Sequence, residues 1–141
     1  MNYANHAQAY RQIATQTAAP GQLVLMLYDG ALGFLERALA GFRQEDPLEH
    51  NQTIHNNLMR AQAIIQELNF ALNMEAGGEL SATLRRLYQY FDDRLHESNL
   101  TKRDRGVREV IERLTVLRNA WAEMLHQEDH NLTTVAVPAE A

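Results

Sequence analysis

Two histidines in this sequence each follow an acidic residue at a spacing that metal-binding helices use. Asp93 precedes His96 and Glu123 precedes His126, so each pair would lie on one face of a helix. Helical bundles that bind two metal ions combine two Glu-x-x-His pairs with single glutamates from two other helices. The single glutamates available here are Glu36 and Glu67. The chemistry to test first is therefore a di-metal carboxylate site.

The orientation of these residues on their helices argues against a metal site. At about 100° per residue, Asp93 and His96 lie more than about 100° from the apolar seam of their helix, and Glu123 and His126 lie at least about 100° from theirs. Such side chains face water instead of one another. We therefore expect neither a metal nor another cofactor.

Other catalytic signatures are missing from the sequence. It contains no Gly-rich phosphate-binding loop and no Gly-x-Ser-x-Gly turn. It has no cysteine, which excludes disulfides, thiolate metal sites and a cysteine nucleophile. The sequence therefore predicts a protein that is not an enzyme.

The size and charge of the chain limit which functions remain possible. A chain of 141 residues with 45% hydrophobic residues suits one domain with a core. The net charge of −5 does not suggest nucleic-acid binding, and we interpret the basic segment 102–105 as a solvated turn. The longest apolar run, 23–28, is far below the ~18 residues needed to span a bilayer. With no signal-peptide pattern at the N-terminus, we expect a cytoplasmic protein without membrane insertion.

Helix breakers divide the chain into four segments. Pro20 suits a first helical turn, Asp46-Pro47 suits an N-cap followed by proline, and Gly77-Gly78 suits a helix end. The predicted helices cover residues 20–43, 47–74, 79–99 and 102–127. Short joints favour an all-α, antiparallel up-down four-helix bundle over residues 19–127. We expect residues 1–18 to form a mobile N-terminal cap segment with a short helix, and residues 128–141 to be disordered.

Each of the last three helices carries an apolar seam at helical spacing. The seam residues are Ile54, Leu58, Ala61, Ile65, Leu68 and Leu72; then Leu80, Leu84, Leu87, Tyr88, Phe91 and Leu95; then Val107, Val110, Ile111, Leu114, Leu117, Trp121 and Leu125. These seams predict the surfaces on which the helices pack.

Two helices carry more apolar surface than one seam requires. The helix 20–43 is apolar over an arc of roughly 200°, whereas a typical surface helix needs little more than ~100°. The helix 47–74 has a second apolar line of Met59, Ala63, Phe70 and Met74. The excess indicates a groove for an amphipathic partner helix. Which part of the first helix faces the bundle and which part faces a partner stays open.

Several motifs recur in the order known from one family. They are Ala9-Tyr10, the run from Ala19 to Ala31 containing Leu-Tyr-Asp-Gly-Ala, Arg60 to Leu68, Gly77-Gly78-Glu79, Leu87-Tyr88-x-Tyr90, Leu95-x-x-Ser98-Asn99 and Leu117-Arg118-x-x-Trp121. Over roughly residues 7–125 the chain resembles the FliS family of flagellar secretion chaperones.

This resemblance implies a function as well as a fold. It implies a cytoplasmic export chaperone that binds the disordered C-terminal helical segment of flagellin and prevents premature polymerisation. The client would then be delivered to an export-gate component of the flagellar type III apparatus. Other flagellar regulators are further implied partners.

A client groove and a cap follow from the resemblance and the apolar pattern together. The predicted groove residues are Leu23, Leu27, Tyr28, Ile64, Leu68, Phe70, Leu84 and Tyr88. Tyr10 and Ile13 are the predicted anchors of the N-terminal cap. An alternative function keeps the groove but assigns another amphipathic-helix client, such as an anti-sigma factor.

Overall fold

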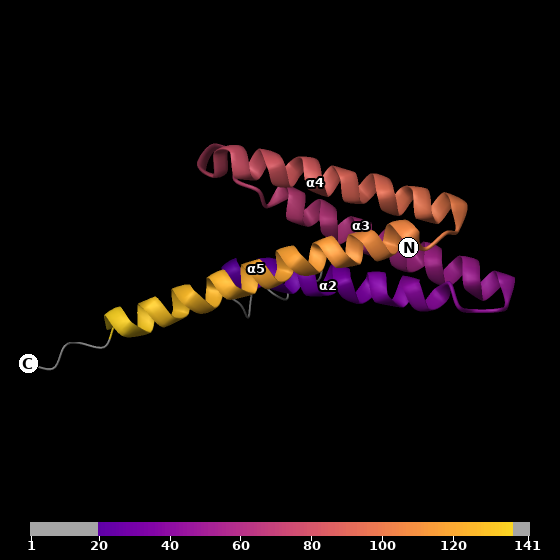
Figure 1. Cartoon of the computed structure of the whole chain (residues 1–141), viewed down its shortest axis with the longest axis horizontal. Coiled ribbons are helices and arrows are strands. Elements are labelled where there is room, and N and C mark those ends of the chain that lie inside the picture. Colours follow the sequence, from indigo (N-terminus) through magenta and orange to yellow (C-terminus); the bar gives the residue numbers. More distant parts are fainter. Residues whose placement is uncertain (1–19, 137–141) are drawn as a thin grey trace, which may run out of the picture.

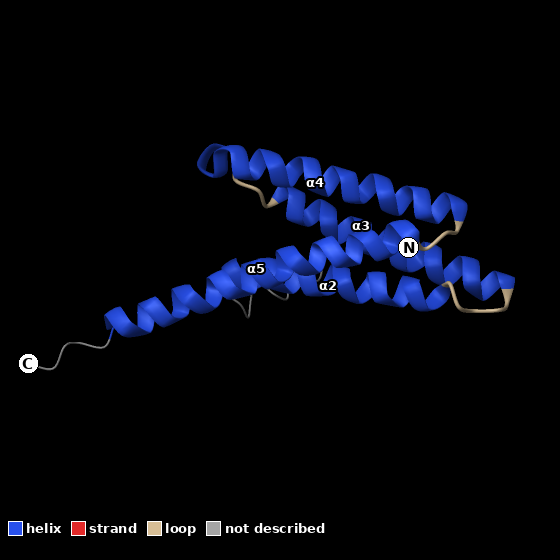
Figure 2. Ribbon diagram, in the orientation of Figure 1, coloured by secondary structure: helices blue, strands red, loops and turns tan. Residues whose placement is uncertain are grey.

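The computed structural model describes residues 20–136, and this part of the chain consists of four helices (Figure 1). They are α2 (Pro20–Gly41), α3 (Pro47–Phe70), α4 (Met74–Thr101) and α5 (Arg105–Ala136). Figure 2 shows helices joined by short loops, with no strand among the described residues. Successive helices run in opposite directions, so the expectation of an all-α, antiparallel four-helix bundle is confirmed.

The four helices form a ring in which each one packs against two others. α2 and α4 both contact α3 and α5, so α2 and α4 face each other across a diagonal. The end where α3 passes into α4 stands away from α2 and α5 in Figure 1. The C-terminal part of α5 extends beyond the other helices at the left of the same view.

The broad apolar arc of α2 is covered on two sides by the bundle itself. Its most deeply buried residues are Leu27, Tyr28, Ala31, Leu35 and Ala38. Beside them lie residues packed against the same core but only partly buried: Leu23, Val24, Leu32, Phe34, Leu39 and Phe42. Because α3 and α5 flank α2, this arc needs no external partner to explain its width.

Most of the predicted seam residues of α3 and α5 lie in the core, whereas Ile111, Leu117 and Trp121 are only partly buried against it. Ile54, Leu58, Ala61, Ile65 and Leu68 of α3 are fully buried, as are Val107, Val110 and Leu114 of α5. Leu→Ala substitutions at such positions typically cost 2–5 kcal/mol. These two seams therefore hold the bundle together.

The seam of α4 is only partly confirmed. Tyr88, Phe91 and Leu95 are buried, and Leu84 is partly buried against the core. Leu80, however, is 67% exposed, so its prediction as a seam residue was wrong. The reason is tertiary: the first turns of α4 lie at the end that stands away from α2 and α5 (Figure 1).

The α3–α4 boundary differs from the predicted one. α3 ends at Phe70, not at residue 74, and α4 begins at Met74 because Asn73 caps a new first turn by accepting a hydrogen bond from the amide of Ala76 at 3.0 Å. Gly78, with φ 52° and ψ −127°, lies inside α4 as a kink. Because Gly78 is non-helical, the glycine pair separates the short turn that begins at Met74 from the long helical segment that follows it, which starts at residue 79 as predicted.

The C-terminal prediction also needs correction. The last helix was expected to end at residue 127 and a disordered tail to begin at residue 128, yet α5 continues to Ala136. No glycine or proline occurs between residues 107 and 137. A helix tends to end before the residue preceding a proline, so Pro138 is the first residue that opposes its continuation.

Candidate functional site

The eight predicted groove residues fall into three environments. Five of them are buried in the core with at most 3% of their surface exposed: Leu27, Tyr28, Ile64, Leu68 and Tyr88. Leu23 and Leu84 are partly buried, and Phe70 is 75% exposed. Only these last three present surface to a partner in this structure, and the assignment of the other five to a groove stays a prediction. Tyr10 and Ile13 of the predicted cap lie outside the described residues.

Tyr28 and Tyr88 join the two helices that face each other across the ring. Their hydroxyl oxygens lie 2.5 Å apart in a buried hydrogen bond between α2 and α4. Burial is the main cause that raises the pKa of both hydroxyls, so both stay protonated at neutral pH. The pair therefore acts as a structural link inside the bundle.

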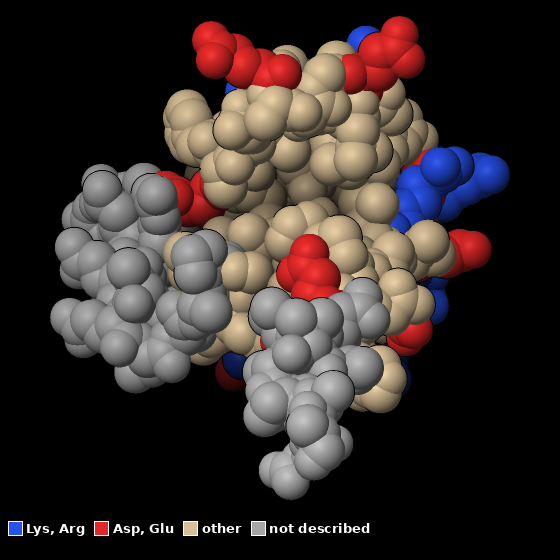
Figure 3. Space-filling model, turned by 90° about the vertical axis from the view of Figure 1, so that its left-hand side faces the viewer, with Lys and Arg blue, Asp and Glu red and all other residues tan. Residues whose placement is uncertain are grey.

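An accessible apolar surface lies where α3 ends and α4 begins. We call it the apolar end, and its residues are Phe70, Leu72, Met74, Leu80 and Leu84. Phe70 is 75% exposed, Leu80 67% and Met74 38%, whereas Leu72 and Leu84 are partly buried against the core. Figure 3 views the molecule from this side and shows uncharged side chains across the upper part of the face, with acidic residues at its upper edge.

Polar contacts hold the backbone of the apolar end in place. The hydroxyl of Ser81 donates to the carbonyl oxygen of Asn73 at 2.9 Å, across the kink at Gly78. The Nε of Arg85 donates to the side-chain oxygen of Asn69 at 3.2 Å, linking α4 back to α3. These bonds present the exposed apolar side chains on a fixed support.

The start of α2 is held by α5. The indole Nε1 of Trp121 donates to the carbonyl oxygen of Gly21 at 2.9 Å. The guanidinium of Arg118 donates to the carboxylate of Asp29 at 2.8 Å, and this bond raises the pKa of Arg118. The acidic residue of the Leu-Tyr-Asp-Gly-Ala motif thus has a structural partner on α5.

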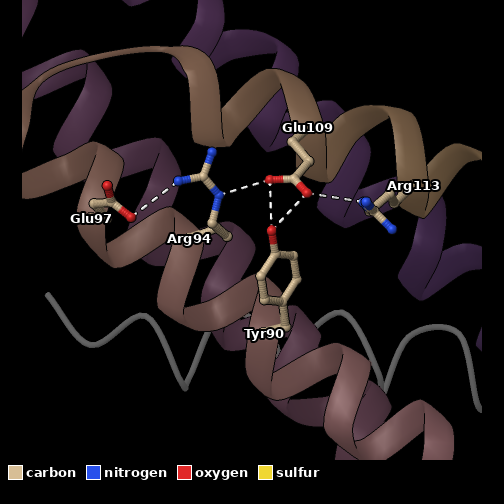
Figure 4. Close-up of polar contacts among 5 residues, drawn as sticks. All are labelled: Tyr90, Arg94, Glu97, Glu109 and Arg113. Carbon is tan, nitrogen blue, oxygen red and sulfur yellow. Dashed lines mark hydrogen bonds and ion pairs between the residues drawn. The ribbon is translucent and has the colours of Figure 1, made fainter.

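A polar network joins α4 to α5 near the opposite end of the bundle (Figure 4). Glu109 of α5 accepts hydrogen bonds from the hydroxyl of Tyr90 at 2.7 Å and from Arg94 Nε at 2.7 Å. It also accepts from Arg113 Nε at 3.0 Å, while Arg94 Nη1 contacts Glu97 at 3.0 Å. The bonds from Tyr90 and Arg94 lower the pKa of Glu109. This network could not be predicted from the sequence, because no local sequence pattern shows how α4 and α5 are aligned along each other.

The residues tested for metal binding are on the surface. Asp93, His96, Glu123 and His126 are all exposed, as their helical positions predict. Among residues 20–136, no group of three or more His, Cys, Asp or Glu side chains is placed to hold a metal ion. Within the same range, none of the helices has the length and apolarity that a bilayer crossing requires.

Comparison with known proteins assigns the family. The family model described as "Flagellar protein FliS" matches residues 3–128. The chain belongs to the FliS family. It is 40% identical over 125 residues to the flagellar secretion chaperone FliS of Bacillus subtilis, covering 88% of this chain and 89% of that protein. The Escherichia coli protein of the same name is 36% identical over 130 residues (89% and 93% covered), and that of Salmonella typhimurium 33% over 129 residues (88% and 93%).

The FliS match includes both surfaces described above. Residues 3–128 contain the whole of α2, α3 and α4 and most of α5. The apolar end and the α4–α5 network therefore both lie within the part that defines the FliS family. This family is one of chaperones and not a known enzyme family.

Proposed function

We propose that this chain is a cytoplasmic export chaperone that binds the C-terminal segment of flagellin and delivers it to the flagellar type III export gate. Membership of the FliS family supports the chaperone role, since relatives in the family are named flagellar secretion chaperones. The structural observation that carries the binding step is the apolar end, where Phe70 and Leu80 are 75% and 67% exposed.

The chemistry of the apolar end suits an amphipathic helix. Contiguous exposed apolar side chains on a soluble protein mark a surface that binds a partner. A client helix buries its own apolar face by packing against such side chains. A client that is disordered alone loses conformational entropy when it folds on the surface, so a large interface is needed for useful affinity. Covering the client's apolar face also keeps that face from pairing with other flagellin molecules.

The double substitution Phe70→Ser/Leu80→Ser tests whether the apolar end binds the client. Burying a Phe or Leu side chain contributes about 1.5–3 kcal/mol, so we expect the double variant to bind a C-terminal flagellin segment at least about tenfold more weakly. It should also lose the ability to delay flagellin polymerisation, measured by light scattering. Both side chains are largely exposed, so the fold should be unaffected.

A matched control uses exposed leucines elsewhere on the bundle. Leu48 at the start of α3 and Leu100 at the end of α4 are 62% and 73% exposed. The variant Leu48→Ser/Leu100→Ser should bind and delay polymerisation as the unchanged protein does. Equal effects of the two double variants would contradict binding at the apolar end. If an anti-sigma factor bound and flagellin did not, the alternative adaptor function would replace the proposed one.

A further inference from the structure

A polar pocket of about 610 Å³ lies between the end of α4 and the start of α5. Gly106 allows the two helices to approach closely at one side of it. A Cβ atom at this position would lie 2.5 Å from the hydroxyl oxygen of Ser98 and 2.7 Å from the carbonyl oxygen of Arg94. The pocket is large enough for a few side chains of a peptide, because small-ligand sites in proteins span roughly 300–1,000 Å³.

Three arginines line this pocket: Arg94, Arg103 and Arg105. Arg94 is bound to Glu97 and Glu109, and Arg113 is bound to Glu109 as well, so two arginines balance the charge of the two acidic residues in the lining. Arg103 and Arg105 are exposed and form no ion pair or side-chain hydrogen bond within the described part of the chain. Their guanidinium groups are therefore available to a ligand.

The surrounding segment is basic in an acidic protein. Residues 94–113 hold six of the 13 lysines and arginines but only four of the 18 acidic residues. The segment thus carries a net charge of +2, whereas the rest of the chain carries −7. Such a local positive field attracts a short anionic ligand, while the negative charge elsewhere opposes a long polyanion such as a nucleic acid.

We propose that this pocket binds an acidic peptide segment of a partner protein, with carboxylates held by Arg103 and Arg105. Arginine suits this ligand because its planar guanidinium can bind a carboxylate through two parallel hydrogen bonds. The segment 102–105 is then a binding element and not only a solvated turn. The proposal goes beyond client binding, since it assigns a second partner to a second surface.

The location of the pocket supports a separate role. It is formed by the last turns of α4 and the first turns of α5, whereas the apolar end is formed by the last turn of α3 and the first turns of α4. The two surfaces therefore lie at opposite ends of the bundle in Figure 1. A client on the apolar end leaves the pocket open.

Fluorescence anisotropy with a fluorescein-labelled hexaglutamate peptide tests the proposal on the full chain. We expect binding at low ionic strength that weakens as salt is added, and no binding of labelled hexaglutamine. The variant Arg103→Glu/Arg105→Glu should bind hexaglutamate at least about tenfold more weakly. Arg103→Gln/Arg105→Gln should weaken binding in the same direction, and circular dichroism should show unchanged helix content for both variants.

The matched control is Arg37→Glu/Arg43→Glu, which reverses two exposed arginines, one on α2 and one just after it, both outside the pocket. It changes the net charge by the same amount and should leave hexaglutamate binding within about twofold. Equal weakening by both charge reversals would overturn the proposal, because the attraction would then be general. Absence of binding up to about 1 mM peptide would also overturn it. Tighter binding of a single-stranded oligonucleotide at the same arginines would replace the acidic peptide by a nucleic acid.

Discussion

The hydroxyl groups of Tyr28 and Tyr88 show how single residues fix the bundle. Each tyrosine is only 3% exposed, and each hydroxyl has the other as its hydrogen-bond partner. Both residues were predicted to line a groove, because a tyrosine can bury its ring and present its hydroxyl to a partner. In the structure the two hydroxyls hydrogen-bond to each other, so neither is left without a hydrogen-bond partner inside the core.

Removing one of these hydroxyls should lower the free energy of unfolding about as much as removing both, or more. Tyr28→Phe leaves the hydroxyl of Tyr88 buried without its partner, which we expect to lower the free energy of unfolding by about 1–3 kcal/mol. Adding Tyr88→Phe to this variant should then lower the free energy of unfolding little further, or raise it again. Urea unfolding of the two single variants and the double variant measures this coupling. Single effects that add within about 0.5 kcal/mol would show that the hydrogen bond contributes nothing.

At the scale of the helix, the kink at Gly78 separates the first turn of α4 from the rest. With φ 52° and ψ −127°, Gly78 adopts a backbone conformation that residues with a side chain rarely adopt. The kink gives the capped turn that begins at Met74 its own direction, which places Met74 and Leu80 in the apolar end. The conformation of one glycine therefore helps to shape the proposed client surface.

Substituting this glycine should destabilise the protein, whereas substituting a helical glycine should not. Gly78→Ala strains the positive-φ backbone and should lower the free energy of unfolding by about 1–2 kcal/mol. Gly33 lies inside α2, and no atom beyond its neighbours and its own helix backbone lies within 4 Å of the place a Cβ would occupy. Gly33→Ala should therefore raise stability by about 0.5–1 kcal/mol. Thermal unfolding of both variants measures the difference, and a stabilising Gly78→Ala would contradict the role of the kink.

Sequence periodicity predicted the helices better than it predicted their accessible faces. The seam from Ile54 to Leu68 is predictable because an apolar residue at every third or fourth position must face a neighbour. Leu80 continues the α4 seam equally well, but its exposure depends on how far the α3–α4 end stands from α2. Leu27 and Leu68 were predicted to line the groove, yet the structure buries both in the core, because periodicity does not say which helix covers a given apolar face.

Considered as a whole, the molecule carries two different surfaces at opposite ends. The apolar end lies on the α3–α4 connection, and the arginine-lined pocket lies on the α4–α5 junction. The first suits the apolar face of a client helix, whereas the second suits carboxylates. α4 contributes to both ends and is linked to α2 in the core by the Tyr28–Tyr88 hydrogen bond. This arrangement suits a chaperone that must hold a client and still be recognised by another protein.

We propose that this chain binds the C-terminal segment of flagellin through apolar contacts. Isothermal titration calorimetry of the full chain with that segment, repeated at two temperatures, tests it most directly. We expect one segment to bind per chain with a negative heat-capacity change, because burial of apolar surface and folding of the segment both lower the heat capacity. Absence of binding at high micromolar concentration, or binding without a heat-capacity change, would contradict it.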